Sequence, residues 1–149
     1  MHTYRDLALH ILKDKGLRIT KPRRLVVDVL DKAEQALSAY DIKDLLSEQG
    51  EKVDTVSIYR IIECLEANQL VHRILTTGKV RKCQLEHEDH CQLERSNHCH
   101  HLLICQKCGD IEEIHCLGLT TVIKDVEKES HFKVREHNLE FLGLCAKCA

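Results

Sequence analysis

Two Cys-x-x-Cys pairs restrict the fold of this chain more than any other feature of its sequence. The pairs are Cys105–Cys108 and Cys145–Cys148, and 36 residues separate them. A two-residue spacing lets both thiolates of a pair reach one ion, and two such pairs complete a tetrahedral four-sulfur site. Because the gap exceeds that of a minimal zinc finger, the fold itself must bring the pairs together. Four protein ligands leave no open position, so the spacing predicts a structural Zn²⁺ site.

The distribution of cysteine and histidine favours metal binding over a disulfide framework. Eight of the nine cysteines and eight of the eleven histidines follow residue 82. Histidine has no use in a disulfide scaffold, whereas it often joins thiolates in metal sites. A redox pair of the thioredoxin type belongs in a strand–helix–strand setting that is absent here. We therefore interpret the cysteines as ligands in a cytosolic protein.

Hydropathy and charge indicate where the chain acts and which half faces a partner. The apolar stretches are far shorter than the roughly 20 residues of a membrane span, and charges interrupt the N-terminal apolar residues as in an amphipathic helix. We expect a cytoplasmic protein without a membrane partner. Residues 1–82 carry 15 Lys and Arg against 12 Asp and Glu, and residues 83–149 carry 7 against 12. The first half is therefore the expected phosphate-facing surface.

The first half predicts a series of short helices followed by a β-hairpin. Thr20 is suited to cap one helix, and Ser38 with Asp41 resembles a capping box for the next. Two strands are expected at residues 70–75 and 80–85. This order describes a winged helix-turn-helix, whose last helix enters the major groove of DNA. On pattern alone, a helical core with a hairpin of no DNA-binding role is the alternative.

The second half predicts a small α+β unit around the two cysteine pairs. Strands at residues 102–104 and 111–114 bracket the first pair, and a helix covers residues 119–130. A further strand at residues 132–144 leads into the second pair. A unit of this size buries little apolar surface, so metal and dimerisation are expected to stabilise it. The expected domains are 1–85 (winged helix), 86–101 (metal-ligand-rich connector) and 102–149 (dimerisation and metal binding).

The connector gathers metal-ligand residue types, of which most are expected to be solvated loop residues. A site that combines imidazole, thiolate and carboxylate suits Zn²⁺ better than Fe²⁺ or Mn²⁺. The candidates in and beside the connector are His87, His90, Cys91, His98, Cys99, His100 and His101.

Several segments together resemble the ferric uptake regulator family along nearly the whole chain. They are TKPR at 20–23, LSAYD at 37–41, TVSIYR at 55–60, HHLLICQKCG at 100–109 and GLCAKC at 143–148. The one departure in the third segment is Ile58, before Tyr59. The resemblance implies an N-terminal winged helix, a C-terminal dimerisation domain and metal-dependent binding of a homodimer to double-stranded operator DNA.

The resemblance also implies which residues contact DNA. Tyr59 and Arg60 are expected to read base edges, with Tyr40 and Arg23 nearer the phosphate backbone. Without the family match, Tyr59 and Arg60 would read equally well as an ordinary pair on a helix surface.

Within the family, the chain is most similar to the zinc uptake regulator branch. Iron-type members carry a hinge histidine before the third helix, and residues 34–37 here are EQAL. The branch implies a regulatory Zn²⁺ held by His72, Cys83, His98 and Glu113. His100 or His101 could replace His98, because the connector is long. A third family site is indicated by His137, although Thr120 stands where its carboxylate is expected.

The sequence therefore predicts a zinc-responsive repressor of metal-uptake genes that is not an enzyme. An iron or peroxide sensor on the same scaffold is the alternative, since it differs only at the regulatory ligands. A zinc hydrolase or deaminase is the alternative from another class. Deaminases need proline before their cysteine pair, whereas Ile104 and Leu144 precede the pairs here, and HExxH is also absent.

Overall fold

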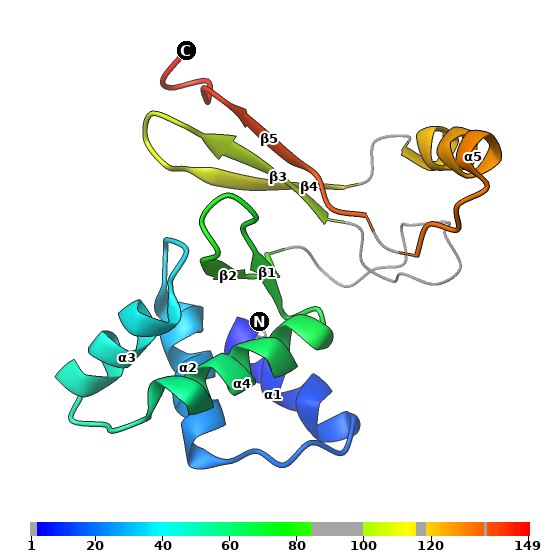
Figure 1. The fold of residues 1–149 in the computed structure, drawn as a ribbon. Coiled ribbons are helices and arrows are strands. Elements are labelled where there is room, and N and C mark those ends of the chain that lie inside the picture. The colour runs from blue at the N-terminus through cyan, green and yellow to red at the C-terminus, as the bar shows by residue number, and fades with distance from the viewer. Residues whose placement is uncertain (1–2, 85–99, 116–118, 136) are drawn as a thin grey trace. The chain divides into compact units, whose positions relative to one another are not determined.

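The computed structural model describes residues 3–84, 100–115, 119–135 and 137–149. The chain forms two compact units, Met1–Gln84 and Leu85–Ala149, which are described separately (Figure 1). His98 and most of the expected connector lie outside the described residues. No helix within the described ranges is both long enough and apolar enough to cross a membrane.

The first unit contains the expected helices and hairpin. Thr20 accepts a hydrogen bond from the backbone N–H of Arg23. Ser38 and Asp41 exchange capping-box hydrogen bonds of 2.8 and 3.0 Å, as the sequence predicted. These caps satisfy backbone donors that a helix start otherwise leaves unpaired. The elements are α1 (Tyr4–Asp14), α2 (Lys21–Lys32), α3 (Ala39–Glu48), α4 (Thr55–Ala67), β1 (Val71–Arg73) and β2 (Val80–Lys82).

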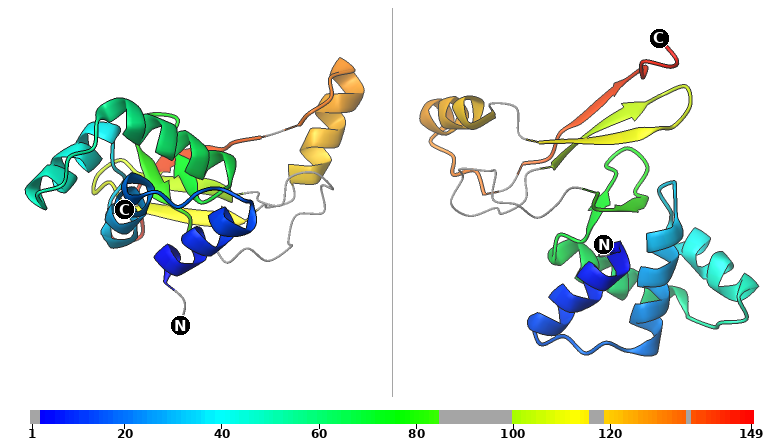
Figure 2. Two further views of the ribbon diagram at one scale, coloured as in Figure 1. Left: turned by 90° about the horizontal axis from the view of Figure 1, so that it is seen from below. Right: turned by 180° about the vertical axis from the view of Figure 1, so that it is seen from behind.

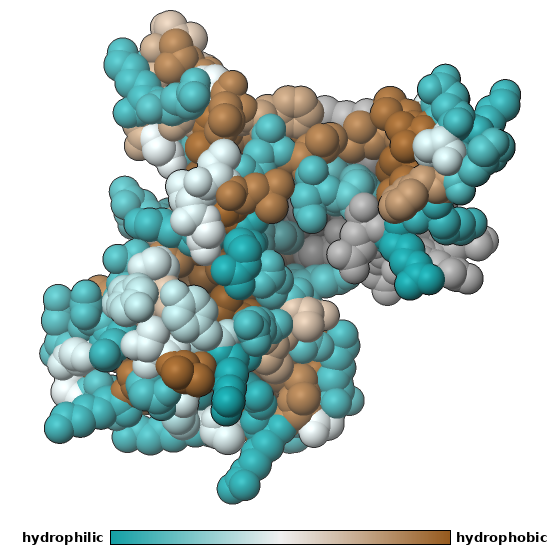
Figure 3. All heavy atoms as spheres, in the orientation of Figure 1, coloured by the Kyte–Doolittle hydropathy of each residue, from teal (hydrophilic) through white to brown (hydrophobic). Residues whose placement is uncertain are grey.

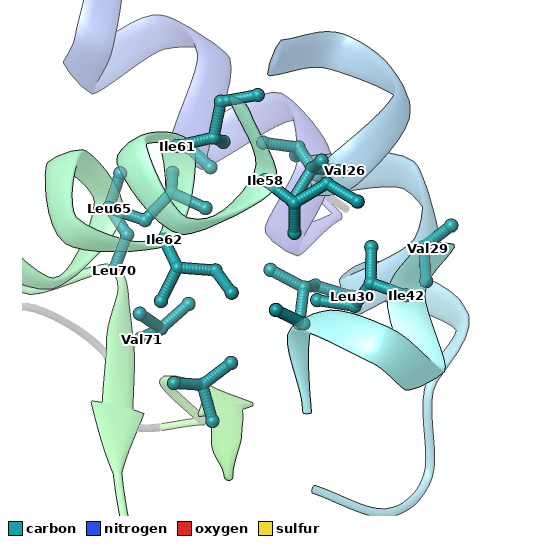
Figure 4. Packing of buried hydrophobic residues seen from close by; sticks show 14 of the residues in the cluster. Val26, Val29, Leu30, Ile42, Ile58, Ile61, Ile62, Leu65, Leu70 and Val71 are labelled. Carbon is teal, nitrogen blue, oxygen red and sulfur yellow. The ribbon is translucent and has the colours of Figure 1, made fainter. Parts of the chain in front are cut away.

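One face of α4 forms part of the core of this unit. Ile58 and Leu65 are fully buried and Ile62 nearly so. They pack toward α2 and α3, where Leu30 and Ile42 are also buried (Figure 4). Because a helix has 3.6 residues per turn, burying these positions leaves the opposite face of α4 exposed.

The hairpin is shorter than expected but firmly attached to the helices. Both strands have three residues. The Ile74 N–H still bonds to the Lys79 carbonyl in the register of the ladder, but the Gly78 N–H bonds back to the Ile74 carbonyl at 2.7 Å and closes the chain into a turn there. Leu37, just before α3, exchanges two backbone hydrogen bonds with Val80 of β2. Arg73 of β1 forms an ion pair with Glu66 of α4, with Nη2 to Oε2 at 2.8 Å. The unit is therefore a winged helix-turn-helix.

The second unit is a three-stranded sheet and a helix. Its elements are β3 (His100–Cys105), β4 (Ile111–His115), α5 (Leu119–Ser130) and β5 (Glu140–Gly143). The strand order is β4-β3-β5, with β3 antiparallel to β4 and parallel to β5. The three strands run side by side in the right view of Figure 2. The α+β fold class predicted from the sequence is confirmed.

Two strand limits in this unit differ from those predicted. β3 begins at His100, inside the expected connector, because β4 continues to His115 and pairs with it. The expected strand at residues 132–144 is reduced to its last residues. The backbone N–H groups of Phe132 and Val134 instead bond to side chains of α5, at 3.2 and 2.8 Å, so they are not available to a sheet.

The second unit exposes several large apolar side chains (Figure 3). They lie on and just after α5, and on and just after the edge strand β5, and a single copy of the unit leaves them uncovered. They are Val122, Val126, Phe132, Phe141, Leu142 and Leu144, which are 46 to 68% exposed.

Candidate metal centres and DNA-facing helix

The topology of the sheet brings the two cysteine pairs together. Cys105 is the last residue of β3, and it pairs with Gly143 at the end of β5. Parallel strands finish at the same edge of a sheet, so the two turns that follow these strands are neighbours. Cys145 comes two residues after Gly143, and its backbone N–H donates to the Cys105 sulfur at 3.3 Å.

Each pair folds into a tight turn that directs its sulfurs inward. Gly109 has φ of +75°, a left-handed conformation that glycine adopts without strain. Its N–H bonds to the Cys105 carbonyl at 2.9 Å, and in the second turn the Ala149 N–H bonds to the Cys145 carbonyl at 2.9 Å. Two equivalent turns therefore present four thiols to one point.

The sulfur positions fit a tetrahedral metal ion. The Sγ atoms of Cys105, Cys108, Cys145 and Cys148 all lie within 4.8 Å of one another. Cys108 Sγ and Cys145 Sγ are 3.7 Å apart. Zinc–sulfur bonds of about 2.3 Å in a tetrahedron put sulfurs about 3.8 Å apart. The donor set and its dimensions thus match a four-thiolate zinc site.

The surroundings of the cluster favour a thiolate at Cys105. Backbone N–H groups of Cys108 and Cys145 donate to its sulfur and lower its pKa from 9.0 to about 6. The pKa of Cys148 is raised to about 12, first by its hydrogen bond with Cys145 and then by burial. Backbone donors also support metal-bound thiolates, so the turns supply outer hydrogen bonds as well as ligands.

The wing brings His72 and Cys83 together in the first unit. His72 pairs with Arg81, and the Cys83 N–H bonds to the Leu70 carbonyl at 3.0 Å, which continues the ladder. Side chains alternate along a strand, so His72 and Cys83 share one face of the hairpin. Their donor atoms lie within 4.8 Å of each other. This is a nitrogen–sulfur pair suited to Zn²⁺.

The remaining predicted ligands of the regulatory and third sites divide between the two faces of the sheet in the second unit. Glu113 of β4 lies opposite Leu102, whereas His101 lies opposite Ile114. Alternation therefore puts the Glu113 and His101 side chains on opposite faces of the sheet. The His101 ring is buried, and its centroid is 5.3 Å from that of His137.

The exposed face of α4 carries the predicted base-reading residues. Tyr59 is 42% exposed, and Arg60 is also exposed. Tyr40 at the start of α3 is 62% exposed. Arg23 is half-buried, and its Nη1 donates to the Arg18 carbonyl, which holds the connection between α1 and α2. Of the four predicted contacts, Arg23 therefore has the least freedom to reach a phosphate.

Sequence reasoning missed the surroundings of Cys83. Tyr4 of α1 packs against the helical core, and the Lys82 ammonium lies 6.0 Å from the centroid of its ring. Lys82 also forms an ion pair with Asp31 of α2, with Nζ to Oδ1 at 3.8 Å. No local motif signals these contacts, because they join α1, α2 and β2 across the fold.

Comparison with protein families identifies the scaffold. The model of the ferric uptake regulator family matches residues 14–142. The chain belongs to the ferric uptake regulator family. It is a metal-responsive transcription regulator and not an enzyme, which excludes the hydrolase and deaminase alternatives.

Individual relatives within the ferric uptake regulator family include both iron and zinc regulators. The ferric uptake regulation protein of Neisseria gonorrhoeae is 31% identical, over 92% of this chain and 90% of its own length. The zinc uptake regulation protein of Escherichia coli K12 is 27% identical, over 95% of this chain and 78% of its own. A solved zinc uptake regulator, complexed with zinc and DNA, has a TM-score of 0.81 at 25% identity, covering 99% and 95% of the two chains. The fold agrees with the predicted zinc branch, whereas the sequence is similar to both iron and zinc regulators.

Proposed function

We propose that this member of the ferric uptake regulator family is a zinc-responsive repressor of metal-uptake genes. The observation that carries the proposal is the pairing of His72 with Cys83 in the wing. Their ring nitrogen and sulfur lie within 4.8 Å of each other on one face of the hairpin. A thiolate ligand favours Zn²⁺ over Fe²⁺ and Mn²⁺. The solved zinc uptake regulator of similar fold, which is complexed with zinc and DNA, supports the same interpretation.

The structural ion is assigned to Cys105, Cys108, Cys145 and Cys148. Four thiolates fill a tetrahedral coordination shell and leave no position open for a substrate or water. This Zn²⁺ therefore stabilises the second unit. Cys105→Ser should release one zinc per chain and unfold or monomerise the second unit. A stable dimer with unchanged zinc content would contradict the assignment.

The regulatory ion is assigned to His72, Cys83, His98 and Glu113. The strand register supports a choice among the histidines, because Glu113 and His101 lie on opposite faces of the sheet. His101 is therefore a weaker substitute for His98, and His100 remains the other alternative. His137 remains the candidate for the third family site.

The ligands suggest how metal controls DNA binding. His72 and Cys83 belong to the first unit and Glu113 to the second, so shared ligation restricts the orientations available to the units. Metal acts by binding the DNA-competent orientation better than the others. In a homodimer this restriction fixes the spacing of the two α4 helices relative to a two-fold operator.

Homodimerisation and DNA contact complete the proposal. The exposed apolar surface of α5 and β5 is assigned to a second copy of the chain, in a cytoplasmic dimer. Tyr59 and Arg60 are assigned to base edges, with Tyr40 and Arg23 nearer the backbone. The small positive excess of residues 1–82 supports this orientation on DNA.

The deciding experiment is a titration of operator affinity against buffered free metal. Cys83→Ser and His98→Ala should retain the structural zinc and the dimer but lose the zinc-dependent gain in affinity. His87→Ala and His90→Ala are matched controls from the connector and should respond as the parent does. If these controls lose the zinc-dependent gain in operator affinity while Cys83→Ser keeps it, the regulatory ligands lie in the connector instead.

The iron-sensing alternative is tested in the same titration. Ferric uptake regulation proteins are among the relatives at 30% identity or more, which favours it as the second candidate. A nitrogen–sulfur site ordinarily binds Zn²⁺ more tightly than Fe²⁺. If Fe²⁺ instead raises operator affinity at a lower free concentration than Zn²⁺ does, iron is the regulatory metal.

A further inference from the structure

Val56 is an exposed apolar side chain in the first turn of α4. It is 60% exposed, whereas Ile58 and Ile62 of the same helix are buried in the core. Isolated apolar side chains are ordinary on a protein surface, so exposure alone assigns Val56 no role. Valine is also a poorer helix former than alanine, so the helix itself gives no reason for valine here. What distinguishes Val56 is its place on α4.

Val56 lies on the same exposed face of α4 as the predicted base-reading residues. Tyr59 and Arg60 follow it by three and four residues, the spacing that makes side chains neighbours on a helix, and all three are exposed. Val56 is one turn closer to the start of α4. A recognition helix contacts base edges with its N-terminal residues. A docking of α4 that places Arg60 against base edges therefore also brings Val56 into the major groove.

The two residues that follow Val56 have other roles. Ser57 donates from its backbone N–H to Asp54 Oδ1 at 2.9 Å and from its hydroxyl to Asp54 Oδ2 at 2.5 Å, so its side chain belongs to the helix cap. Ile58 is fully buried in the core. Of residues 56–58, Val56 is therefore the one whose side chain is presented to whatever α4 contacts.

The chemistry of valine matches one group in the major groove. Its side chain ends in two methyl groups and has no hydrogen-bond donor or acceptor. The base pairs present donors and acceptors in this groove, and thymine also presents its apolar C5-methyl group. A methyl group packed against a donor or acceptor would shield it from water without replacing its hydrogen bond, which costs free energy. The base edge that suits Val56 is therefore that of thymine.

We propose that Val56 is a further specificity-determining residue of α4, which selects thymine by contact with its C5-methyl group. This inference rests on the proposed docking of α4 in the major groove. Side chains three or four residues apart on a helix are about 5–6 Å apart, and successive base pairs are about 3.4 Å apart. The selected thymine therefore lies one or two base pairs from the position that Arg60 reads.

The test uses duplexes that the zinc-saturated parent protein selects from a random DNA library, so the natural operator need not be known. Each thymine of the selected site is replaced by deoxyuridine, which removes the C5-methyl group and keeps every hydrogen-bonding group of the base. Fluorescence anisotropy measures the affinities of the parent and of Val56→Ala for each duplex. At one position in each half-site, replacement should weaken binding by the parent about fourfold per methyl group, the scale for one buried carbon group.

Combining the two changes separates contact with the methyl group from an effect on α4 itself. At that position, Val56→Ala should weaken binding to the thymine duplex, and deoxyuridine should weaken the variant no further. If Val56→Ala loses the same affinity on the thymine and deoxyuridine duplexes, Val56 does not contact the methyl group and the inference is overturned. If the full effect of deoxyuridine persists in Val56→Ala at every position, the methyl groups are read by other residues, and the inference is again overturned.

Arg60→Ala distinguishes failure of this inference from failure of the proposed docking. If Arg60→Ala and Val56→Ala both bind the selected duplexes as the parent does, α4 does not face the groove and the docking fails together with the inference. If Arg60→Ala weakens binding but no deoxyuridine effect depends on Val56, the docking stands and only the inference fails. Leu7→Ala is the control for loss of an exposed apolar side chain, because Leu7 is 37% exposed on α1. It should bind both kinds of duplex as the parent does.

Discussion

Cys105 is the residue whose chemistry the fold changes most clearly. Two backbone N–H groups lower the pKa of its thiol from 9.0 to about 6. Because the pKa of Cys105 is lower in the folded chain than in the unfolded chain, its ionisation stabilises the fold. This contribution is complete above pH 9 and is lost as the pH falls through about 6. The metal-free, reduced protein should therefore contain a Cys105 thiolate at neutral pH as long as its two cysteine turns remain folded.

This thiolate can be measured by its ultraviolet absorbance during a pH titration. The metal-free protein is expected to show a thiolate transition near pH 6, well below that of an ordinary cysteine. Cys105→Ser should abolish this transition, whereas Cys64→Ser, on α4, should retain it. An unchanged transition in Cys105→Ser would assign the low pKa to another thiol.

Substitution of Arg60 tests whether the exposed face of α4 contacts DNA. Arg60→Ala should weaken specific operator binding by about 1–3 kcal/mol, the usual range for one base contact. Zinc content and dimerisation should be unchanged, because Arg60 is exposed and lies opposite the buried side of the helix. Affinity is measured by fluorescence anisotropy on operator and on scrambled DNA. Equal affinity of variant and parent for operator would show that α4 does not face the groove.

Spacing along the chain was enough to predict that the two cysteine pairs meet, because a two-residue gap suits one ion. In the structure the sulfurs of Cys105, Cys108, Cys145 and Cys148 do lie within 4.8 Å of one another. Tyr4 was not identified, because its place beside Lys82 depends on how α1 packs against a hairpin almost eighty residues away. The sequence also did not reveal that Glu113 and His101 lie on opposite faces of the sheet, because this depends on the register of β3 with β4.

At the scale of elements, local capping signals predicted the helices. Ser38 and Asp41 satisfy each other's backbone N–H groups at the start of α3. Strands were predicted less well, since their limits depend on a partner. The expected strand after α5 is shortened because Glu127 binds the backbone N–H of Val134, a contact that no alternation of side chains reveals.

The capping box at α3 gives a prediction for stability. Ser38→Ala should lower the free energy of unfolding by about 1 kcal/mol, because it removes the acceptor for the Asp41 N–H. Ser47→Ala is the matched control on the same helix, since the Ser47 hydroxyl only bonds back to the Lys43 carbonyl. Denaturant unfolding measures both variants. Equal effects would show that the cap contributes nothing specific.

At the scale of the whole molecule, the apolar surface of the second unit predicts association. A double substitution, Phe141→Glu with Leu142→Glu, should convert the dimer into a monomer, because it puts charges on both faces of the edge strand β5. Leu75→Glu is the control, since Leu75 is 61% exposed but lies in the first unit. Light scattering after size exclusion reports the mass. A dimer in both variants would exclude β5 from the interface.

The position of the two cysteine pairs has a consequence for how the protein is made. Joining Cys108 to Cys145 closes a loop of 36 residues, and a permanent cross-link of that length restricts an unfolded chain by about 4 kcal/mol. A shared ion is a cross-link that exists only when metal is supplied during synthesis. Chains made under severe zinc starvation should therefore remain partly unfolded and be degraded by cellular proteases, so that the amount of regulator falls together with its signal.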